Sequence, residues 1–204
     1  MNEARVGSYE TWTDWARVQA RVITEPVARW LAHLGVHPNT ITLLGFGLAV
    51  AVGVVLAFGQ LRIGGALLAL VSSLDAFDGA LARFSNKKSR FGAFLDSTLD
   101  RLSEGALLAG LFVWFVGQGA AVEIYLLFAA LLGSVMVSYT RARAEGVGYT
   151  CKVGLFTRVE RVLLLSVGLL LGWPTPTLWI LVVLTWVTVL QRMLYVYKES
   201  RRTP

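Results

Sequence analysis

The sequence predicts an all-α integral membrane protein, with six transmembrane helices preceded by an amphipathic interfacial helix. The 204-residue chain is 55% hydrophobic and 16% charged, with a mean hydropathy of +0.61. A soluble domain of this length is rarely so apolar. We expect a single membrane domain over residues 1–204, with the interfacial helix at 9–34 and the six-helix bundle at 40–197.

The apolar residues gather in six stretches, most of them close to the roughly 20 residues that a helix needs to cross hydrocarbon. The fifth stretch is the shortest. The six predicted spans are Thr40–Phe58, Ile63–Ala82, Gly92–Val116, Ala121–Tyr139, Val159–Leu171 and Thr177–Tyr195. Several glycines in the first two spans predict close packing between helices. These glycines are Gly45, Gly47, Gly53, Gly64 and Gly65.

Lysine and arginine occur on alternate connections between the predicted spans. Four basic residues each lie before the first span, between the second and third, between the fourth and fifth, and at the C-terminal end. The other connections contain only Arg62. This bias predicts that both termini and the two basic loops face the cytoplasm. The net charge of +6 would attract anionic headgroups, and nucleic acid is not an expected partner because the charges are divided among membrane-edge loops.

The segment Tyr9–Leu34 has an amphipathic pattern that differs from the six spans. Trp12, Trp15 and Trp30 recur at roughly helical spacing, with arginines among them. Such a helix is typical of the membrane interface, and Pro26 should kink or divide it. Packing of this helix on the protein's own cytoplasmic face is an equally good interpretation.

Four aspartates stand in one register around the connection between the second and third spans. Asp75 and Asp78 are three residues apart and Asp96 and Asp100 are four apart, so each pair shares one face of its helix. The short connection 84–91 makes the two spans antiparallel neighbours. A rise of about 1.5 Å per residue places Asp78 and Asp100 at similar depth in the cytoplasmic leaflet. Carboxylates there are costly and persist mainly where they bind a ligand or move charge.

Four ionised carboxylates so close together would repel one another, and divalent cations would offset this charge. Oxygen ligands favour Mg²⁺ or Mn²⁺, and two such ions about 4 Å apart can hold the attacking and leaving oxygens of a phosphoryl transfer. The small residues Gly79, Ala82 and Gly92 would let a bulky ligand approach the backbone. Arg83 can pair with a phosphate or an aspartate. Pairing of the aspartates with Arg83 and Arg101 would explain only two of the four carboxylates.

This register resembles the signature of the CDP-alcohol phosphatidyltransferase family, D-x2-D-G-x2-A-R-x8-G-x3-D-x3-D, and matches every fixed position from Asp75 to Asp100 without a gap. The resemblance implies that an acceptor alcohol attacks the lipid-linked phosphorus of a CDP-linked lipid and that CMP leaves. It also implies two Mg²⁺ or Mn²⁺ ions, a homodimer and particular residue roles. The implied metal ligands are Asp75, Asp78, Asp96 and Asp100, with Asp100 also the general base, and the implied CDP-lipid pocket is Gly79, Ala82, Arg83 and Gly92.

A second basic cluster surrounds the connection between the fourth and fifth spans. Arg158 and Arg161 share a helix face, whereas Arg141 and Arg143 cannot. A phosphorylated acceptor requires fixed cations, and arginine offers a bidentate fork. The positive-inside bias alone would also explain the cluster. The predicted acceptor-phosphate residues are Arg141, Arg143, Lys152, Arg158 and Arg161.

The pattern S-Y-x-R-A-R-A-E at 138–145, followed by R-x-E-R at 158–161, resembles the branch of the family that uses inositol 1-phosphate. Glycerol 3-phosphate, the acceptor of phosphatidylglycerolphosphate synthases, is the second candidate, and serine, which needs fewer cations, is the third. The donor would be CDP-diacylglycerol or an ether analogue. A divalent-cation transporter also needs intramembrane carboxylates, but the outer halves of these spans carry almost no polar groups. A non-catalytic scaffold is the remaining alternative.

Overall fold

A computed structural model describes the backbone of residues 37–84 and 89–201 and the side chains of 37–73 and 89–201. Within these ranges the regular structure is entirely helical. The helices are α2 (Pro38–Ala57), α3 (Leu61–Phe84), α4 (Arg90–Gly117), α5 (Ala121–Gly146), α6 (Arg158–Leu171) and α7 (Pro174–Ser200). Each coincides with one predicted span. The interfacial helix expected at Tyr9–Leu34 lies outside the described residues.

Three of the described helices, α2, α5 and α7, are long and apolar enough to cross a membrane by length and composition alone. The other three depart from this pattern for visible reasons. In α3, the part whose side chains are described, Leu61–Ser73, is apolar but shorter than a membrane span. α4 contains Asp96, Asp100 and Glu104, and α6 has only 14 residues.

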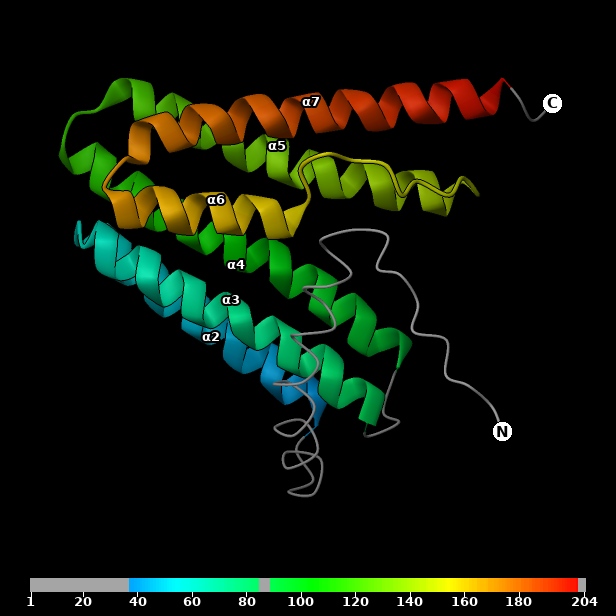
Figure 1. Ribbon diagram of the computed structural model, residues 1–204, viewed down its shortest axis with the longest axis horizontal. Coiled ribbons are helices and arrows are strands. Elements are labelled where there is room, and N and C mark those ends of the chain that lie inside the picture. Colours follow the sequence, from blue (N-terminus) through cyan, green and yellow to red (C-terminus); the bar gives the residue numbers. More distant parts are fainter. Residues whose placement is uncertain (1–36, 85–88, 202–204) are drawn as a thin grey trace, which may run out of the picture.

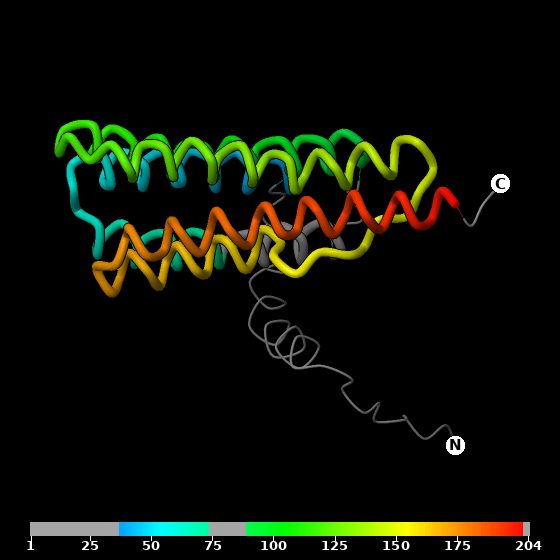
Figure 2. Tube along the Cα trace, turned by 90° about the horizontal axis from the view of Figure 1, so that it is seen from above, coloured from blue at the N-terminus to red at the C-terminus, as the bar shows by residue number. Residues whose placement is uncertain are grey.

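The helices form two layers, as Figure 2 shows. One layer contains α2, α4 and α5, and the other contains α3, α6 and α7. The layers pack together most extensively at their edges, through α2 against α3 and α5 against α7. Each helix contributes an almost fully buried leucine to the core between the layers. These leucines are Leu56, Leu68, Leu111, Leu127, Leu169 and Leu181.

Glycines permit the closest approaches between helices. A Cβ on Gly110 of α4 would overlap the carbonyl group of Gly53 on α2, so only glycine fits this crossing. Gly64 and Gly65 of α3 similarly face Leu56 of α2 and the backbone of α6. Close packing is therefore confirmed at Gly53, Gly64 and Gly65. The same prediction was wrong for Gly47, where a Cβ would meet no atom of the described residues within 4 Å.

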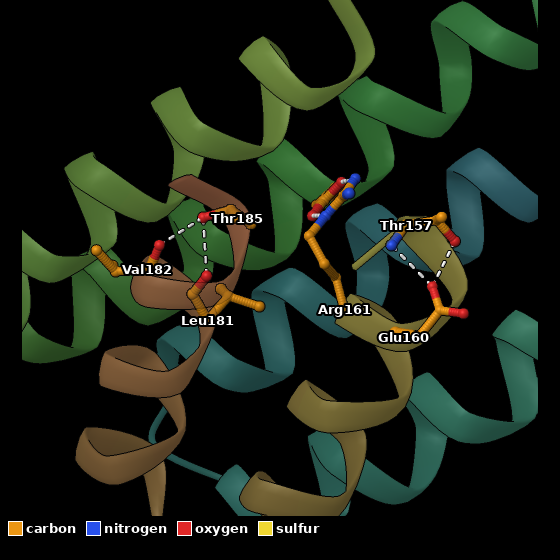
Figure 3. A network of polar contacts seen from close by, with 7 residues as sticks. Thr157, Glu160, Arg161, Leu181, Val182 and Thr185 are labelled. Carbon is orange, nitrogen blue, oxygen red and sulfur yellow. Dashed lines mark hydrogen bonds and ion pairs between the residues drawn. The ribbon is translucent and has the colours of Figure 1, made fainter. Parts of the chain in front are cut away.

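The two ends of the bundle differ in the connections that they carry (Figure 1). The short turns after α2, α4 and α6 lie at one end. At the other end α3 finishes, α4 begins, and the connection 147–157 leads into α6. A capping box fixes the start of α6, in which the Thr157 N–H donates to Glu160 Oε2 at 2.8 Å (Figure 3). This cap determines where Arg158 stands as the first residue of α6.

Candidate active site

The aspartate register lies at the end of the bundle that carries the long connections. Asp75 and Asp78 lie in the last part of α3, and Asp96 and Asp100 in the first part of α4. Figure 1 shows α3 ending where α4 begins, so both pairs are at the same end. The side chains of Asp75, Asp78, Ala82 and Arg83 lie outside the described ones, as do the surroundings of Gly79, and the roles of these residues stay predictions.

The start of α4 is built tightly around Gly92. Ser89 caps the helix, and its hydroxyl accepts a hydrogen bond from the Gly92 N–H at 2.8 Å. A Cβ on Gly92 would lie 3.0 Å from Ser89 Oγ and 3.1 Å from Asn39 Oδ1 of α2. The absence of a side chain at Gly92 therefore keeps this turn close to α2, one turn before Asp96.

Asp100 lies between two arginines and is half-buried. Its Oδ1 is 2.8 Å from Nη1 of Arg158 on α6, and its Oδ2 is 3.9 Å from Nη1 of the adjacent Arg101. The short contact has the length of a charge-assisted hydrogen bond. The structure thus places an acceptor-phosphate candidate, Arg158, directly beside the predicted general base.

One helical turn further along α4, Glu104 forms a second ion pair with α6. Its two carboxylate oxygens accept hydrogen bonds from Nε and Nη2 of Arg161 at 2.6 and 2.7 Å. The two side chains are only 7% and 2% exposed. In Figure 3, Arg161 extends from α6 toward α4. Nη1 of Arg161 is buried and has no hydrogen-bond partner in the described part of the chain.

The predicted acceptor cations on α5 are separated from each other. Arg141 lines a cavity of about 580 Å³ between α4 and α5, together with Arg101, Ser97 and Ser138, and pairs with Glu145 at 2.9 Å. Arg143 lines a different groove, of about 350 Å³, between α5 and α7. The structure therefore brings Arg141 to the α4 side of the helix and leaves Arg143 on the other side. Lys152 is exposed on the connection to α6.

Arg192 of α7 is a buried cation that the sequence pattern does not reveal, and it lines the same groove as Arg143. It is 4% exposed, and it donates hydrogen bonds to the carbonyl groups of Val153, at 2.9 Å, and Val137. It therefore ties the connection 147–157 to α5 and α7. Arg141 and Arg161 are close enough for their charges to act on Arg192, so the fold gathers several arginines at this end of the bundle. No local pattern indicates these contacts, because Arg192 belongs to the basic C-terminal end of the chain and its partners are far away in the sequence.

The donors present fit a divalent cation. Asp96 is exposed and Asp100 half-buried at the open end of α4, and both offer hard oxygen ligands. Among the described side chains, no three acids, histidines or cysteines gather into a metal site. The side chains of Asp75 and Asp78, which the predicted site requires, lie outside the described ones. Asp96 and Asp100 alone supply two of the four predicted ligands.

Comparison with known proteins identifies the class. The model of the CDP-alcohol phosphatidyltransferase family matches residues 35–193. The chain therefore belongs to this family, and it is an integral membrane transferase of phospholipid biosynthesis.

Individual relatives indicate which members of the family the chain resembles. The chain is 37% identical over 179 residues to archaetidylinositol phosphate synthase of Pyrococcus horikoshii, covering 87% of this chain and 91% of that protein. Its fold matches the crystal structure of Mycobacterium tuberculosis phosphatidylinositol phosphate synthase with CDP-DAG bound. That match has a TM-score of 0.80 at 31% identity and covers 86% of this chain and 94% of the other. The same enzyme in complex with manganese and citrate gives a TM-score of 0.78 at 30% identity, covering 85% and 88%.

Proposed function

We propose that this protein transfers a phosphatidyl-type group from a CDP-linked lipid to inositol 1-phosphate and releases CMP. The observation that supports this most directly is the pair of α6 arginines beside the predicted base. Arg158 contacts Asp100 at 2.8 Å, and Arg161 is buried next to it with an unpaired N–H among the described residues. Cations fixed beside the base suit an acceptor that already bears a phosphate. Relatives named for inositol phosphate acceptors support the same assignment.

The chemical step follows from the position of Asp100. Its carboxylate takes the proton from the acceptor hydroxyl as that oxygen attacks the lipid-linked phosphorus. A new phosphorus–oxygen bond forms, the bond to the CMP phosphate breaks, and CMP leaves with the displaced oxygen. Arg158 contacts Asp100 Oδ1 at 2.8 Å and so holds the carboxylate in place. Gly79, Ala82, Arg83 and Gly92 line the pocket for the CDP-linked lipid.

Two divalent cations, Mg²⁺ or Mn²⁺, would be held by Asp75, Asp78, Asp96 and Asp100. When bound, they would supply positive charge that offsets the charge on the donor's phosphate oxygens during the transfer. The relative solved with manganese supports this cofactor class. The carboxylates of α3 and α4 would hold the cations, and the cations would in turn position the donor phosphates near Asp100.

Among the five predicted acceptor cations, we assign the acceptor phosphate to Arg141, Arg158 and Arg161. Arg158 and Arg161 project from α6 toward α4, and Arg141 lines the cavity between α4 and α5. Arg143 faces the groove between α5 and α7 and Lys152 is exposed, so these two attract anionic headgroups.

In this proposal the six helices of the single domain 1–204 all cross the bilayer, and the active site and both termini face the cytoplasm. The alternating basic connections support this orientation. A nucleotide-activated donor also suits a cytoplasmic site. We further propose a homodimer. A monomer mass in detergent together with full activity would contradict the dimer.

Glycerol 3-phosphate is the second candidate acceptor, because it also carries a phosphate that Arg158 and Arg161 would bind. Purified protein in detergent with Mg²⁺ and a CDP-linked lipid would be given inositol 1-phosphate, glycerol 3-phosphate, free inositol or serine, and CMP release would be followed. We expect release with inositol 1-phosphate alone. Release with glycerol 3-phosphate alone would retain the aspartate mechanism and reject the acceptor. Release of CMP with free inositol would show that the acceptor needs no phosphate, and so would reject the proposed role of the arginines. The family match gives no support to a cation transporter.

A further inference from the structure

Glu104 is a buried carboxylate that the aspartate signature does not include. It lies four residues after Asp100, one turn further along the same face of α4. Both of its oxygens accept hydrogen bonds from Arg161, and its side chain is 7% exposed. Burial of a carboxylate is costly, so a core position with no role beyond packing would favour an apolar residue.

The position of Glu104 in the fold is also specific. α4 and α6 are the middle helices of the two layers (Figure 1). Among the described residues, α4 packs extensively on α2 and α5, and α6 packs on α3 and α7, but α4 and α6 do not pack extensively on each other. Two ion pairs one turn apart bridge them instead, Asp100 with Arg158 and Glu104 with Arg161. The deeper pair therefore sets how α6 faces α4, and with it the place of Arg158 beside the base.

In the Glu104–Arg161 pair, one nitrogen of the arginine, Nη1, takes no part in the contact. A guanidinium is planar and rigid, so binding of Nε and Nη2 to Glu104 also fixes the direction of Nη1. Nη1 is buried and has no hydrogen-bond partner among the described residues. A buried unpaired N–H is costly, and an anion that accepts from it removes this cost.

We propose that Glu104 is a positioning residue for the acceptor, which holds Arg161 by its Nε and Nη2 so that Nη1 binds the acceptor phosphate. This inference rests on the proposed function, because it supposes a phosphorylated acceptor. Glu104 touches no reacting atom. It acts through Arg161, and through α6 on Arg158.

The first test uses Glu104→Gln, which keeps the shape of the side chain and removes its charge. Its matched control is Glu123→Gln on α5, because Glu123 also bonds across to another helix, accepting from Thr175 of α7 at 2.7 Å. We expect Glu104→Gln to raise the acceptor KM about tenfold or more, the value of one charge-assisted hydrogen bond, and to leave the CDP-lipid KM unchanged. The control should change neither. A purely structural role would lower kcat through loss of active protein, with both KM values unchanged, and would overturn the proposal.

A double variant tests whether Glu104 acts through Arg161. Arg161→Lys keeps the positive charge but cannot form the two-donor contact. If Glu104 works only by orienting Arg161, the double variant raises the acceptor KM no more than the more severe single variant. Multiplication of the two single effects would show independent roles and overturn the proposal. Should Glu104→Gln fail to fold, Glu104→Asp replaces it. Aspartate keeps the charge but withdraws it by one methylene, so a selective rise in acceptor KM is again expected.

Inorganic phosphate provides a readout that needs no turnover. Thermal unfolding in detergent would be followed while phosphate is titrated, without a CDP-linked lipid. Phosphate should stabilise the native protein and Glu123→Gln, and should stabilise Glu104→Gln much less. Equal stabilisation of all three would overturn the positioning role. A Glu104-dependent shift in a protein that does not use inositol 1-phosphate would support the positioning role and reject the proposed acceptor.

Discussion

At the scale of single residues, the account depends on Asp100 and the cation beside it. Asp100 is half-buried and 2.8 Å from Arg158, whereas Asp96 is exposed. Two carboxylates on one helix face thus have different surroundings. The one held by an arginine of α6, Asp100, is the carboxylate that we propose as the general base. Asp96 is open to the exterior, which suits a metal ligand.

Asp100→Asn should abolish most of the activity with the fold retained. The amide cannot accept the acceptor proton, and general-base catalysis contributes about 10²–10⁴-fold. We therefore expect kcat to fall at least a hundredfold by that measure, with thermal unfolding in detergent close to that of the native protein. CMP release is the measurement. Retained activity in this variant would favour a non-catalytic scaffold.

Arg158→Ala should raise the KM of the acceptor far more than that of the CDP-linked lipid. The guanidinium lies at the junction of α6 and Asp100, and its loss removes a cation for the acceptor phosphate and the partner of the base. Arg143→Ala is the matched control, because Arg143 lines the groove on the other side of α5. Equal changes in both KM values would remove Arg158 from the acceptor site.

At the scale of the helices, the sequence predicted the elements better than their partners. All six predicted spans correspond to helices, because long apolar runs bounded by charges are strong local signals. The aspartate register could be recognised because its spacing lies within two adjacent helices. The Glu104–Arg161 pair joins residues 57 positions apart. Periodicity within a helix does not reveal which helix faces it, so this pair and Arg192 were missed.

Gly53→Ala should destabilise the contact between α2 and α4. Its Cβ would overlap the carbonyl group of Ala106, and overpacking of this kind costs about 1–3 kcal/mol. Gly47→Ala lies on the same helix with nothing within 4 Å, so it should be neutral or stabilise the protein by about 0.5–1 kcal/mol through helix propensity. Thermal unfolding in detergent compares the two. If Gly47→Ala lowered the unfolding temperature and Gly53→Ala did not, the close contact between α2 and α4 at Gly53 would be contradicted.

At the scale of the whole molecule, two three-helix layers bring the aspartates and the arginines to one end. The aspartates come from α3 and α4, one helix in each layer, and the arginines come from α5, α6 and α7. The sequence indicated each group separately, through one signature and one basic connection. Their meeting is a consequence of the layer order, which no local pattern in the chain encodes.

Removal of divalent metal should abolish turnover. Four carboxylates without cations would repel one another and leave the donor phosphates without ligands. We expect chelation to stop CMP release and Mn²⁺ or Mg²⁺ to restore it. The apo protein should also unfold at a lower temperature than the loaded protein, because a ligand bound only by the native state stabilises it. Full activity in excess chelator would reject the metal assignment.

The most direct test of the account is a competition experiment read by mass spectrometry of the lipid product. Purified protein with Mg²⁺ and a CDP-linked lipid would be given equal concentrations of inositol 1-phosphate and glycerol 3-phosphate. The account predicts a lipid that contains inositol and two phosphates, one from each substrate, with CMP formed in equal amount. A product that contains glycerol phosphate instead, or inositol with a single phosphate, would contradict it.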